Sequence, residues 1–300
     1  MSRPEHPLLP RWLRRPVRDH CRWIAQARNL VHRATPVEED APDCRLFGST
    51  FELCTVLDLA ERMPYPHLLD ALPSFEALWT AWRTGFEPPH DDPAAEFGRW
   101  SRQSSTPPAW LHAAGSNLAQ LMPMLYRLGN TAEANRDMLT FLNAHVQSFN
   151  DRSRIAATER PAFRAFWRMH TAGPRESLRE LGPVRAADVP FRGGHRMGDL
   201  IAGVSMVEIK TGRMQDEQLA DTALQAVTYA LLAEAEGYDV RDVTVYLARY
   251  GLVIRTPLQE FADDLAGGPA NLADARHALA HDDPPWPPNA RGPHHQGRLE

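Results

Sequence analysis

The sequence predicts an α/β fold, a mixed sheet of four or five strands flanked by helices, together with a largely helical N-terminal half. Three observations predict it. Residues 199–210 carry Leu, Ile, Val and Met on both sides of Gly203, which is typical of two short strands joined by a tight turn. Residues 216–236 have apolar side chains at helical spacing. Residues 243–249 and 251–256 are β-branched and aromatic, and extend the sheet as two further strands.

The N-terminal half, residues 1–150, consists of segments with helical periodicity separated by Pro-rich or acidic loops. Its helices are predicted over residues 17–33, 46–63, 74–84, 109–128 and 132–149. The 46–63 segment contains the first core helix. Ser49 is its expected N-cap, and Glu52 three residues later completes a capping box. Pro64 is expected to end this helix.

The second half divides into a sheet-forming core over residues 151–266 and a tail over 267–300. Further elements are predicted at 162–170 (helix), 183–189 (first strand), 257–265 (helix) and 272–280 (helix). From His281 the sequence is rich in Pro, His and Gly, so the tail is expected to be mostly disordered.

The composition excludes several classes of protein. With 43% hydrophobic residues, 300 residues can bury a sizeable core, and there is no run of about 18 apolar residues that would span a membrane. Residues 1–22 carry charges and prolines where a signal peptide needs an apolar stretch. We therefore expect a cytoplasmic protein with no membrane association. The three cysteines lack C-x-x-C spacing, which argues against a structural zinc site or a disulfide framework.

The 199–210 hairpin is expected to place acidic side chains opposite each other. Gly at the first position of a two-residue loop suits a type II′ turn, and counting outward from Gly203 puts Asp199 across from Glu208. Because side chains alternate along a strand, Lys210 shares their face of the sheet. The other face then receives the core residues Leu200, Val207 and Ile209.

This arrangement of charges suggests a chemistry. Two opposed carboxylates repel each other and destabilise a sheet. A hard cation between them offsets the repulsion, and carboxylate oxygens are ligands that Mg²⁺ prefers. A lysine one step along the same face adds a proton donor or a charge that orients water. Together these groups form the skeleton of a metal-dependent phosphodiester-cleaving site. The alternative interpretation is an exposed strand edge with a cross-strand charge pair.

Two observations favour the catalytic interpretation. Lys210 is the only lysine of the chain, so that 32 of the 33 Lys and Arg residues are arginine. Lysine and arginine are not interchangeable chemically, which makes this single lysine notable. In addition, Gln225 and Tyr229 lie four residues apart in a predicted helix and therefore on one of its faces.

Asp199, the tripeptide Glu208-x-Lys210 and the helix Gln225-x-x-x-Tyr229 together resemble the PD-(D/E)XK nuclease superfamily, in its RecB-like branch. The resemblance implies a restriction-endonuclease-like fold. It also implies metal-dependent hydrolysis of phosphodiester bonds in nucleic acid, with a role in bacterial defence or repair. DNA is favoured over RNA as the substrate. The Gln–Tyr pair of similar nucleases holds the catalytic lysine or the DNA backbone in place.

The resemblance covers residues 183–255 and, more thinly, 46–62. The segment Tyr246-Leu247-Ala248-Arg249-Tyr250-Gly251 looks like a strand motif of largely uncharacterised bacterial proteins of this type. The segment Phe47-Gly48-Ser49-Thr50-Phe51-Glu52 looks like the start of their first core helix. Gly198 stands where the family motif has Pro, a departure that is common in this divergent superfamily.

The resemblance also implies a set of metal ligands. Asp199, Glu208 and the backbone carbonyl of Ile209 would hold Mg²⁺ or Mn²⁺, while Lys210 orients the attacking water and stabilises the charge on the phosphate. The three cysteines separate the chain from those relatives that hold an iron–sulfur cluster, because such a cluster needs four.

Two further residues have two interpretations each. Glu52 either caps its helix or reaches the metal, as a first-helix acid does in some relatives, and we favour the cap. His195 lies in a Gly-rich loop. Several RecB-like nucleases add a histidine ligand, but from an earlier helix, so we favour a phosphate contact or no contact at all over metal binding.

The net charge of −5 is unusual for a protein that binds nucleic acid. Residues 1–33 nevertheless carry eight arginines against Glu5 and Asp19. Such a basic arm either contacts phosphates or forms a solvated helix that packs Trp12 and Trp23 inward, and we favour the packed helix.

Three functions are therefore open, of which a Mg²⁺-dependent deoxyribonuclease is favoured. The second is a non-catalytic nucleic-acid-binding or assembly subunit that keeps the nuclease fold. The third is a structural or regulatory subunit that works with a helicase or ATPase partner, since the chain itself has no P-loop motif.

Overall fold

The computed structural model describes Leu13 and residues 21–41, 44–60, 64–65, 160–191 and 196–281. The helices predicted over 74–84, 109–128 and 132–149 lie outside the described residues, as do His195 and the chain beyond residue 281.

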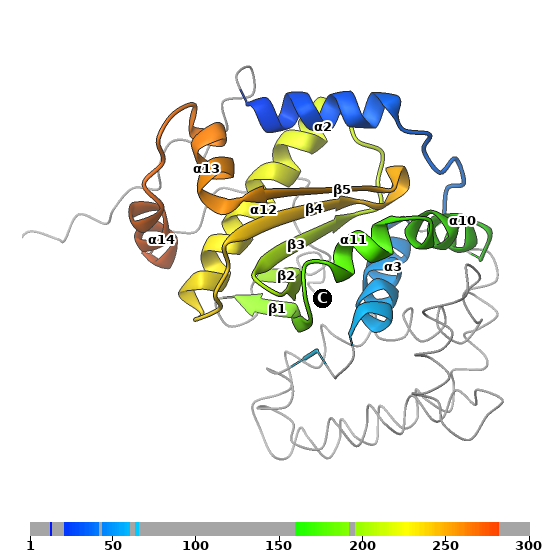
Figure 1. The fold of residues 1–300 in the computed structure, drawn as a ribbon, viewed down its shortest axis with the longest axis horizontal. Coiled ribbons are helices and arrows are strands. Elements are labelled where there is room, and N and C mark those ends of the chain that lie inside the picture. Colours follow the sequence, from blue (N-terminus) through cyan, green and yellow to red (C-terminus); the bar gives the residue numbers. More distant parts are fainter. Residues whose placement is uncertain are drawn as a thin grey trace, which may run out of the picture.

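The centre of the molecule is one five-stranded sheet in the order β1-β2-β3-β4-β5 (Figure 1). Its strands are β1 (Val184–Phe191), β2 (Arg196–Ala202), β3 (Ser205–Lys210), β4 (Asp242–Leu247) and β5 (Leu252–Pro257). Neighbouring strands are antiparallel except β3 and β4, which are parallel. The sequence-based prediction of an α/β fold with a mixed sheet is confirmed.

The parallel pair requires a crossover, and α12 (Asp216–Ala235) provides it. This helix ends where Gly237 adopts φ 90°, the left-handed conformation that glycine supplies after a helix C-terminus. One face of the sheet, here called the α12 face, packs against α12, α2 (Arg22–Arg33) and α13 (Leu258–Ala266), and α14 (Leu272–His281) packs against α12 in the same core. The predicted helix at 272–280 therefore exists and packs on the core.

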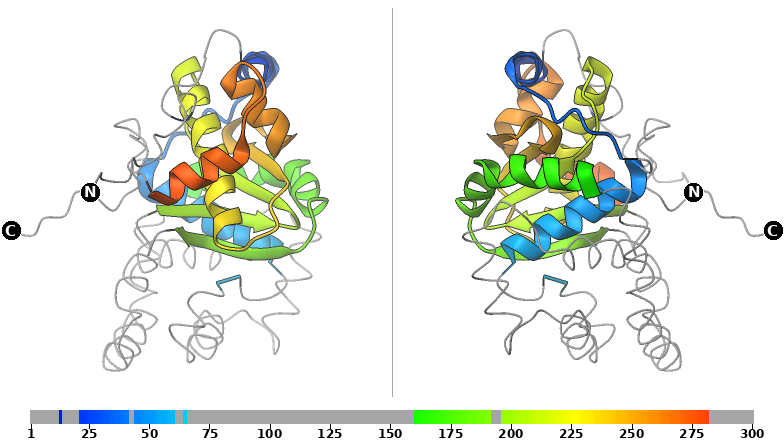
Figure 2. Two further views of the ribbon diagram at one scale, coloured as in Figure 1. Left: turned by 90° about the vertical axis from the view of Figure 1, so that its left-hand side faces the viewer. Right: turned by 90° about the vertical axis from the view of Figure 1, so that its right-hand side faces the viewer.

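The opposite face, here called the α3 face, packs against α3 (Cys44–Leu59) and α10 (Arg160–Thr171), with α11 (Pro174–Arg179) beside them (Figure 2). Because both faces are covered, β3 is buried along most of its length. Leu200, Val207 and Ile209 lie in the α3-face core, as predicted, whereas Ile201 and Met206 lie in the α12-face core.

The hairpin between β2 and β3 has the predicted two-residue turn. Ala202 pairs with Ser205, and Gly203 adopts φ 54°, the positive value that a type II′ turn requires at this position. A side chain would not fit there, because a Cβ atom on Gly203 would lie 1.9 Å from the carbonyl oxygen of Leu181. Gly198 is confined by side chains, since a Cβ there would lie 2.5 Å from the end of the Met206 side chain and 2.9 Å from the Phe191 ring. This close packing accounts for the glycine before Asp199.

The predicted N-cap of the first core helix is wrong. Helix α3 begins at Cys44, so Ser49 lies inside the helix and forms no capping box with Glu52. The reason is tertiary packing: Phe47 is buried and its ring lies 5.0 Å from that of Phe166. Burying this aromatic residue stabilises the turns upstream of Ser49, which outweighs the local capping preference.

The N-terminal helix α2 packs its tryptophan inward. Trp23 is 3% exposed and stacks on Phe261, with ring centroids 4.9 Å apart. Arg22 and Arg28 form ion pairs with Asp264 and Asp216. For this part of the arm, the packed-helix interpretation is confirmed. No helix among the described residues has the length and apolar character needed to cross a membrane.

Candidate active site

Strands β2 and β3 bring Asp199 close to the end of β3. Their ladder ends at the pair Leu200–Val207, one step before Asp199 and Glu208. Instead of a further ladder bond, the Asp199 carboxylate accepts a hydrogen bond from the backbone N–H of Ile209 at 2.6 Å. The two acids that the hairpin register predicted to be neighbours are therefore brought together.

Glu208 is fully buried, and its two carboxylate oxygens differ in their hydrogen bonds. Its Oε1 accepts a hydrogen bond from the Lys210 ammonium group. Its Oε2 has no hydrogen-bond partner among the described residues. An ionised carboxylate with an unpaired buried oxygen is costly. Such an oxygen is a natural position for a cation.

Burial and mutual repulsion shift the titration of this group of acids. Burial first, and then the charge of Asp199, raise the pKa of Glu208 to about 8 despite the opposing effect of Lys210. Burial also raises the pKa of Asp199, although Lys210 and the Ile209 N–H lower it in part. For Lys210, burial alone would lower the pKa, but the carboxylates of Glu208 and Asp199 raise it above the ordinary value, so this lysine is charged.

Helix α12 carries Gln225 and Tyr229 on one face, as their spacing predicted. The Gln225 amide donates a hydrogen bond to the Tyr229 hydroxyl at 3.2 Å. Tyr229 is 5% exposed, and its ring centroid lies 5.5 Å from that of Phe191. Burial raises the pKa of the Tyr229 hydroxyl, and so does the charge of Glu208, which places this hydroxyl within electrostatic reach of the acids.

Glu52 approaches the same acids from α3. One turn earlier on this helix, a Cβ on Gly48 would lie 3.2 Å from the Thr211 hydroxyl, so this face of α3 lies against the end of β3. The pKa of Glu52 is raised well above its ordinary value, first by burial and then by Asp199 and other neighbouring acids. Because no capping box forms, the favoured interpretation of Glu52 is corrected: it faces the acidic group.

Asp188 is a fifth member of this charged group, and the sequence reasoning missed it. Burial and the charge of Asp199 raise the pKa of Asp188 to about 7. The available signal was an aspartate in the interior of a predicted strand, where this residue type is rare. We call the side chains of Glu52, Asp188, Asp199, Glu208 and Lys210 the acidic site.

The acidic site fits a divalent cation by its chemistry, because its donors are carboxylate oxygens, and one of them is buried without a hydrogen bond to any described residue. Among the described residues, no three His, Cys, Asp or Glu side chains already surround one point as a metal-binding group. Glu208 is instead held by Lys210, and Asp199 by the backbone of β3. Ion binding at these residues therefore requires the carboxylates to turn.

The loop after Lys210 is fixed by the η3 turn (Ala248–Tyr250). Arg249 is 7% exposed and donates hydrogen bonds to the carbonyl oxygens of Thr211 and Val37, at 3.2 and 2.6 Å. The Tyr250 hydroxyl accepts a hydrogen bond from the N–H of Met214 at 3.0 Å. The Arg-Tyr pair of the 246–251 segment thus anchors the connection between Lys210 and α12.

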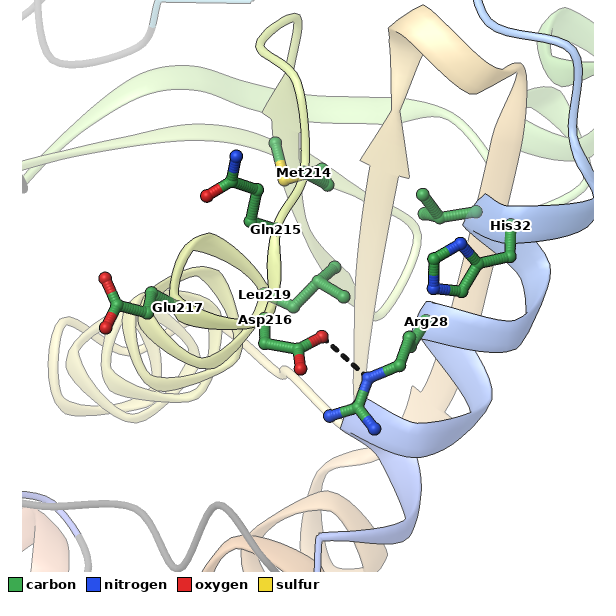
Figure 3. Close-up of a pocket in the computed structure, with 8 residues that line it drawn as sticks. Arg28, His32, Met214, Gln215, Asp216, Glu217 and Leu219 are labelled. Atoms are coloured by element: carbon green, nitrogen blue, oxygen red, sulfur yellow. Dashed lines mark hydrogen bonds and ion pairs between the residues drawn. The ribbon is translucent and has the colours of Figure 1, made fainter.

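The next part of this connection lines a cavity of about 420 Å³ between α2 and the start of α12 (Figure 3). Arg28 and Asp216 close one side of it with an ion pair of 2.6 Å, and the His32 ring lies beside Arg28. The cavity is lined by Arg28, Val31, His32, Met214, Gln215, Asp216, Glu217 and Leu219. No member of the acidic site lines it.

No family model, no curated protein and no solved structure matches this chain.

Proposed function

We propose that this chain is a metal-dependent nuclease of restriction-endonuclease-like fold that hydrolyses phosphodiester bonds of nucleic acid. DNA is the favoured substrate, and the cytoplasm is the proposed location. The observation that carries the proposal is the buried carboxylate of Glu208, next to Asp199. One of its oxygens accepts a hydrogen bond from Lys210, and the other has no hydrogen-bond partner in the part of the chain that the structure describes. Two acids and one lysine on adjoining strands are the residue types that metal-assisted phosphodiester hydrolysis needs.

Each side chain has a role in the proposed reaction. The Asp199 and Glu208 carboxylates and the Ile209 carbonyl hold Mg²⁺ or Mn²⁺, which supplies Lewis-acid activation of water and phosphate. Lys210, charged at neutral pH, orients the attacking water and stabilises negative charge on the phosphate. Gln225 and Tyr229 form the α12 side of the site.

The test is incubation of the purified chain with linear and circular, single- and double-stranded DNA, with Mg²⁺, Mn²⁺ or EDTA. Lys210→Ala is the inactive control. Lys210→Arg is the matched control, because it keeps the charge and changes only its geometry. We expect cation-dependent cleavage by the wild type alone. Equal cleavage by wild type and Lys210→Ala would refute the assignment. Preference for circular or linear DNA separates endonuclease from exonuclease action.

A second candidate is a non-catalytic nucleic-acid-binding or assembly subunit that works with a helicase or ATPase. It is favoured by the net charge of −5 and by the carboxylates of the described residues, which are not yet arranged around a metal position. DNA binding in EDTA without cleavage in Mg²⁺ or Mn²⁺, together with co-purification of an ATPase, would support this function over the first.

A further inference from the structure

Asp188 lies directly across the sheet from Asp199. The flanking pairs of the β1–β2 ladder are Ala187–Leu200 and Val189–Gly198, so the position between them sets Asp188 opposite Asp199. Asp188 is also the one non-glycine residue with a positive φ, 44°, in the part of the chain that the structure describes. Aspartate is among the few residues that adopt this conformation without a large penalty.

The backbone of β1 breaks its regular alternation at this residue. Side chains two apart on a strand normally point to the same face. Here Ala187 belongs to the α3-face core, whereas Val189 belongs to the α12-face core. The pairing register is the same on both sides of Asp188, so no residue is inserted here, and the positive φ of Asp188 accounts for the redirected side chains. The break occurs next to Asp199, where the bond from the Ile209 N–H replaces a regular ladder bond.

The charges on four elements converge at this break. Glu52 on α3 interacts electrostatically with Asp199, Asp188 and Glu208, so acids from α3, β1, β2 and β3 share one buried region. A group of acids alone does not define a binding site. The independent observation is the Glu208 Oε2 atom, which is fully buried and has no hydrogen-bond partner among the described residues.

We propose that Asp188 is a third carboxylate ligand of a divalent cation that is bound between β1, β2 and β3. Asp188 supplies a carboxylate oxygen from β1, opposite Asp199 on β2, and Glu208 supplies its Oε2 from β3. Three carboxylates suit Mg²⁺ and Mn²⁺, which favour oxygen ligands in octahedral arrangement. The inference rests on the proposed function for the choice of cation, but cation binding is measurable without any substrate.

The experiment titrates Mn²⁺ into the full chain and measures bound ion by electron paramagnetic resonance. The test variant is Asp188→Asn, which keeps the shape of the side chain and tolerates a positive φ. The matched control is Asp242→Asn, which removes one strand carboxylate that is bound to Arg255 outside the acidic site. We expect Asp188→Asn to weaken Mn²⁺ binding by about tenfold or more, since even removing an outer-shell partner of a metal site has this effect. Asp242→Asn should bind like the wild type.

Thermal unfolding in EDTA and in Mn²⁺ separates ligation from a structural role. If Asp188 is a metal ligand, Asp188→Asn should melt at the wild-type temperature in EDTA. It should not show the rise in melting temperature that Mn²⁺ gives the wild type. Equal Mn²⁺ affinity of wild type and Asp188→Asn would overturn the inference, as would failure of the wild type to bind millimolar Mn²⁺.

The cleavage assay keeps the two proposals apart. If the wild type cleaves DNA and Asp188→Asn binds Mn²⁺ normally, the inference fails and the nuclease function stands. If Mn²⁺ binding depends on Asp188 but no DNA is cleaved, the inference stands and the nuclease function fails.

Discussion

The molecule buries two groups of charged side chains, and the two groups differ in their balance of charge. On the α3 face, the Asp58 carboxylate accepts a hydrogen bond from Arg175 at 2.8 Å and lies 3.1 Å from His170. The other ring nitrogen of His170 lies 3.2 Å from the Tyr246 hydroxyl. We call these four residues the Asp58 network. In this network one acid, Asp58, pairs with one buried arginine, Arg175, and a guanidinium nitrogen of Arg179 lies 4.0 Å from the Asp58 Oδ1 atom.

The acidic site has the opposite balance, since it consists of four carboxylates and one basic side chain, Lys210. A balanced buried network fixes the positions of the elements that contribute to it. A buried group with an excess of one charge opposes folding. Proteins retain such unfavourable arrangements mainly at functional sites. The comparison therefore predicts that the Asp58 network contributes to stability, whereas the acidic site contributes to activity.

The largest expected effect is on activity. Glu208→Gln keeps the volume of the side chain but removes the charge that holds the cation, so we expect a loss of cleavage by about 10³-fold, at the upper end of effects for single electrostatic groups. Initial cleavage rates in Mg²⁺ measure it.

The same variant should unfold at or above the wild-type temperature, because a buried charge has been removed. A Glu208→Gln protein that cleaves normally, or that fails to fold, would contradict the contrast between the acidic site and the Asp58 network.

The second effect is on stability. Asp58→Ala leaves the buried Arg175 side chain without its partner, and breaking a buried pair in this way costs about 3–5 kcal/mol. Urea unfolding followed by circular dichroism measures the loss. Replacing both partners, as Asp58→Leu with Arg175→Met, should recover much of it. An Asp58→Ala protein as stable as the wild type would show that the network is dispensable.

Replacing Lys210 tests whether this lysine and the metal ion compete for the Glu208 carboxylate. Lys210→Met frees the Glu208 carboxylate and removes a positive charge from the site, so Mn²⁺ should bind about tenfold more tightly, equivalent to about 1.4 kcal/mol. Cleavage should nevertheless be lost. Calorimetric titration with Mn²⁺ measures the affinity, and Arg213→Met, which removes a surface charge nearby in the chain, is the control. Weaker binding by Lys210→Met would contradict the idea that lysine and cation compete for Glu208.

How much of this was visible in the sequence depends on the range of the interactions involved. The β2–β3 turn and the proximity of Asp199 to Glu208 follow from local rules of hairpin geometry, and both predictions are confirmed. The pairing of Gln225 with Tyr229 follows from helical spacing in the same way.

The contribution of Asp188 was not predicted, and the approach of Glu52 to the acids was the less favoured of its two interpretations, because both depend on packing across the fold. Glu52 lies on α3, whose start is set by the packing of Phe47 against α10, a contact that local capping rules do not contain. Asp188 reaches the acidic site because β1 breaks its alternation opposite Asp199, and a positive φ at one strand residue leaves little trace in a single sequence. The Asp58 network joins residues more than a hundred positions apart, so no spacing rule connects them.

The smallest expected effect is the pH dependence of the Asp58 network. Burial lowers the pKa of His170 below its ordinary value of 6.5, although Asp58 opposes this shift. His170 is therefore neutral in the folded protein, with Nε2 donating to Asp58 and Nδ1 accepting from Tyr246. Below pH 6.5 the unfolded chain takes up a proton on His170 that the folded protein does not. The contribution of neutral His170 to the free energy of unfolding is therefore complete above pH 6.5, and it falls as the pH decreases toward the folded-state pKa. The slope is at most about 1.4 kcal/mol per pH unit.

The raised pKa values of Glu208 and Asp188 act in the opposite direction, because protonating these acids in the folded state stabilises it as the pH falls. A single unfolding curve therefore mixes the two groups. The stability difference between the wild type and His170→Gln, measured by urea unfolding from pH 7.5 to pH 5, isolates the histidine because the acids are common to both proteins. The wild type should lose its advantage over His170→Gln as the pH falls below about 6.5. A difference that stays constant over this range would mean that His170 does not titrate between the folded and unfolded states, and that the Asp58 network stabilises the fold through hydrogen bonds and packing alone.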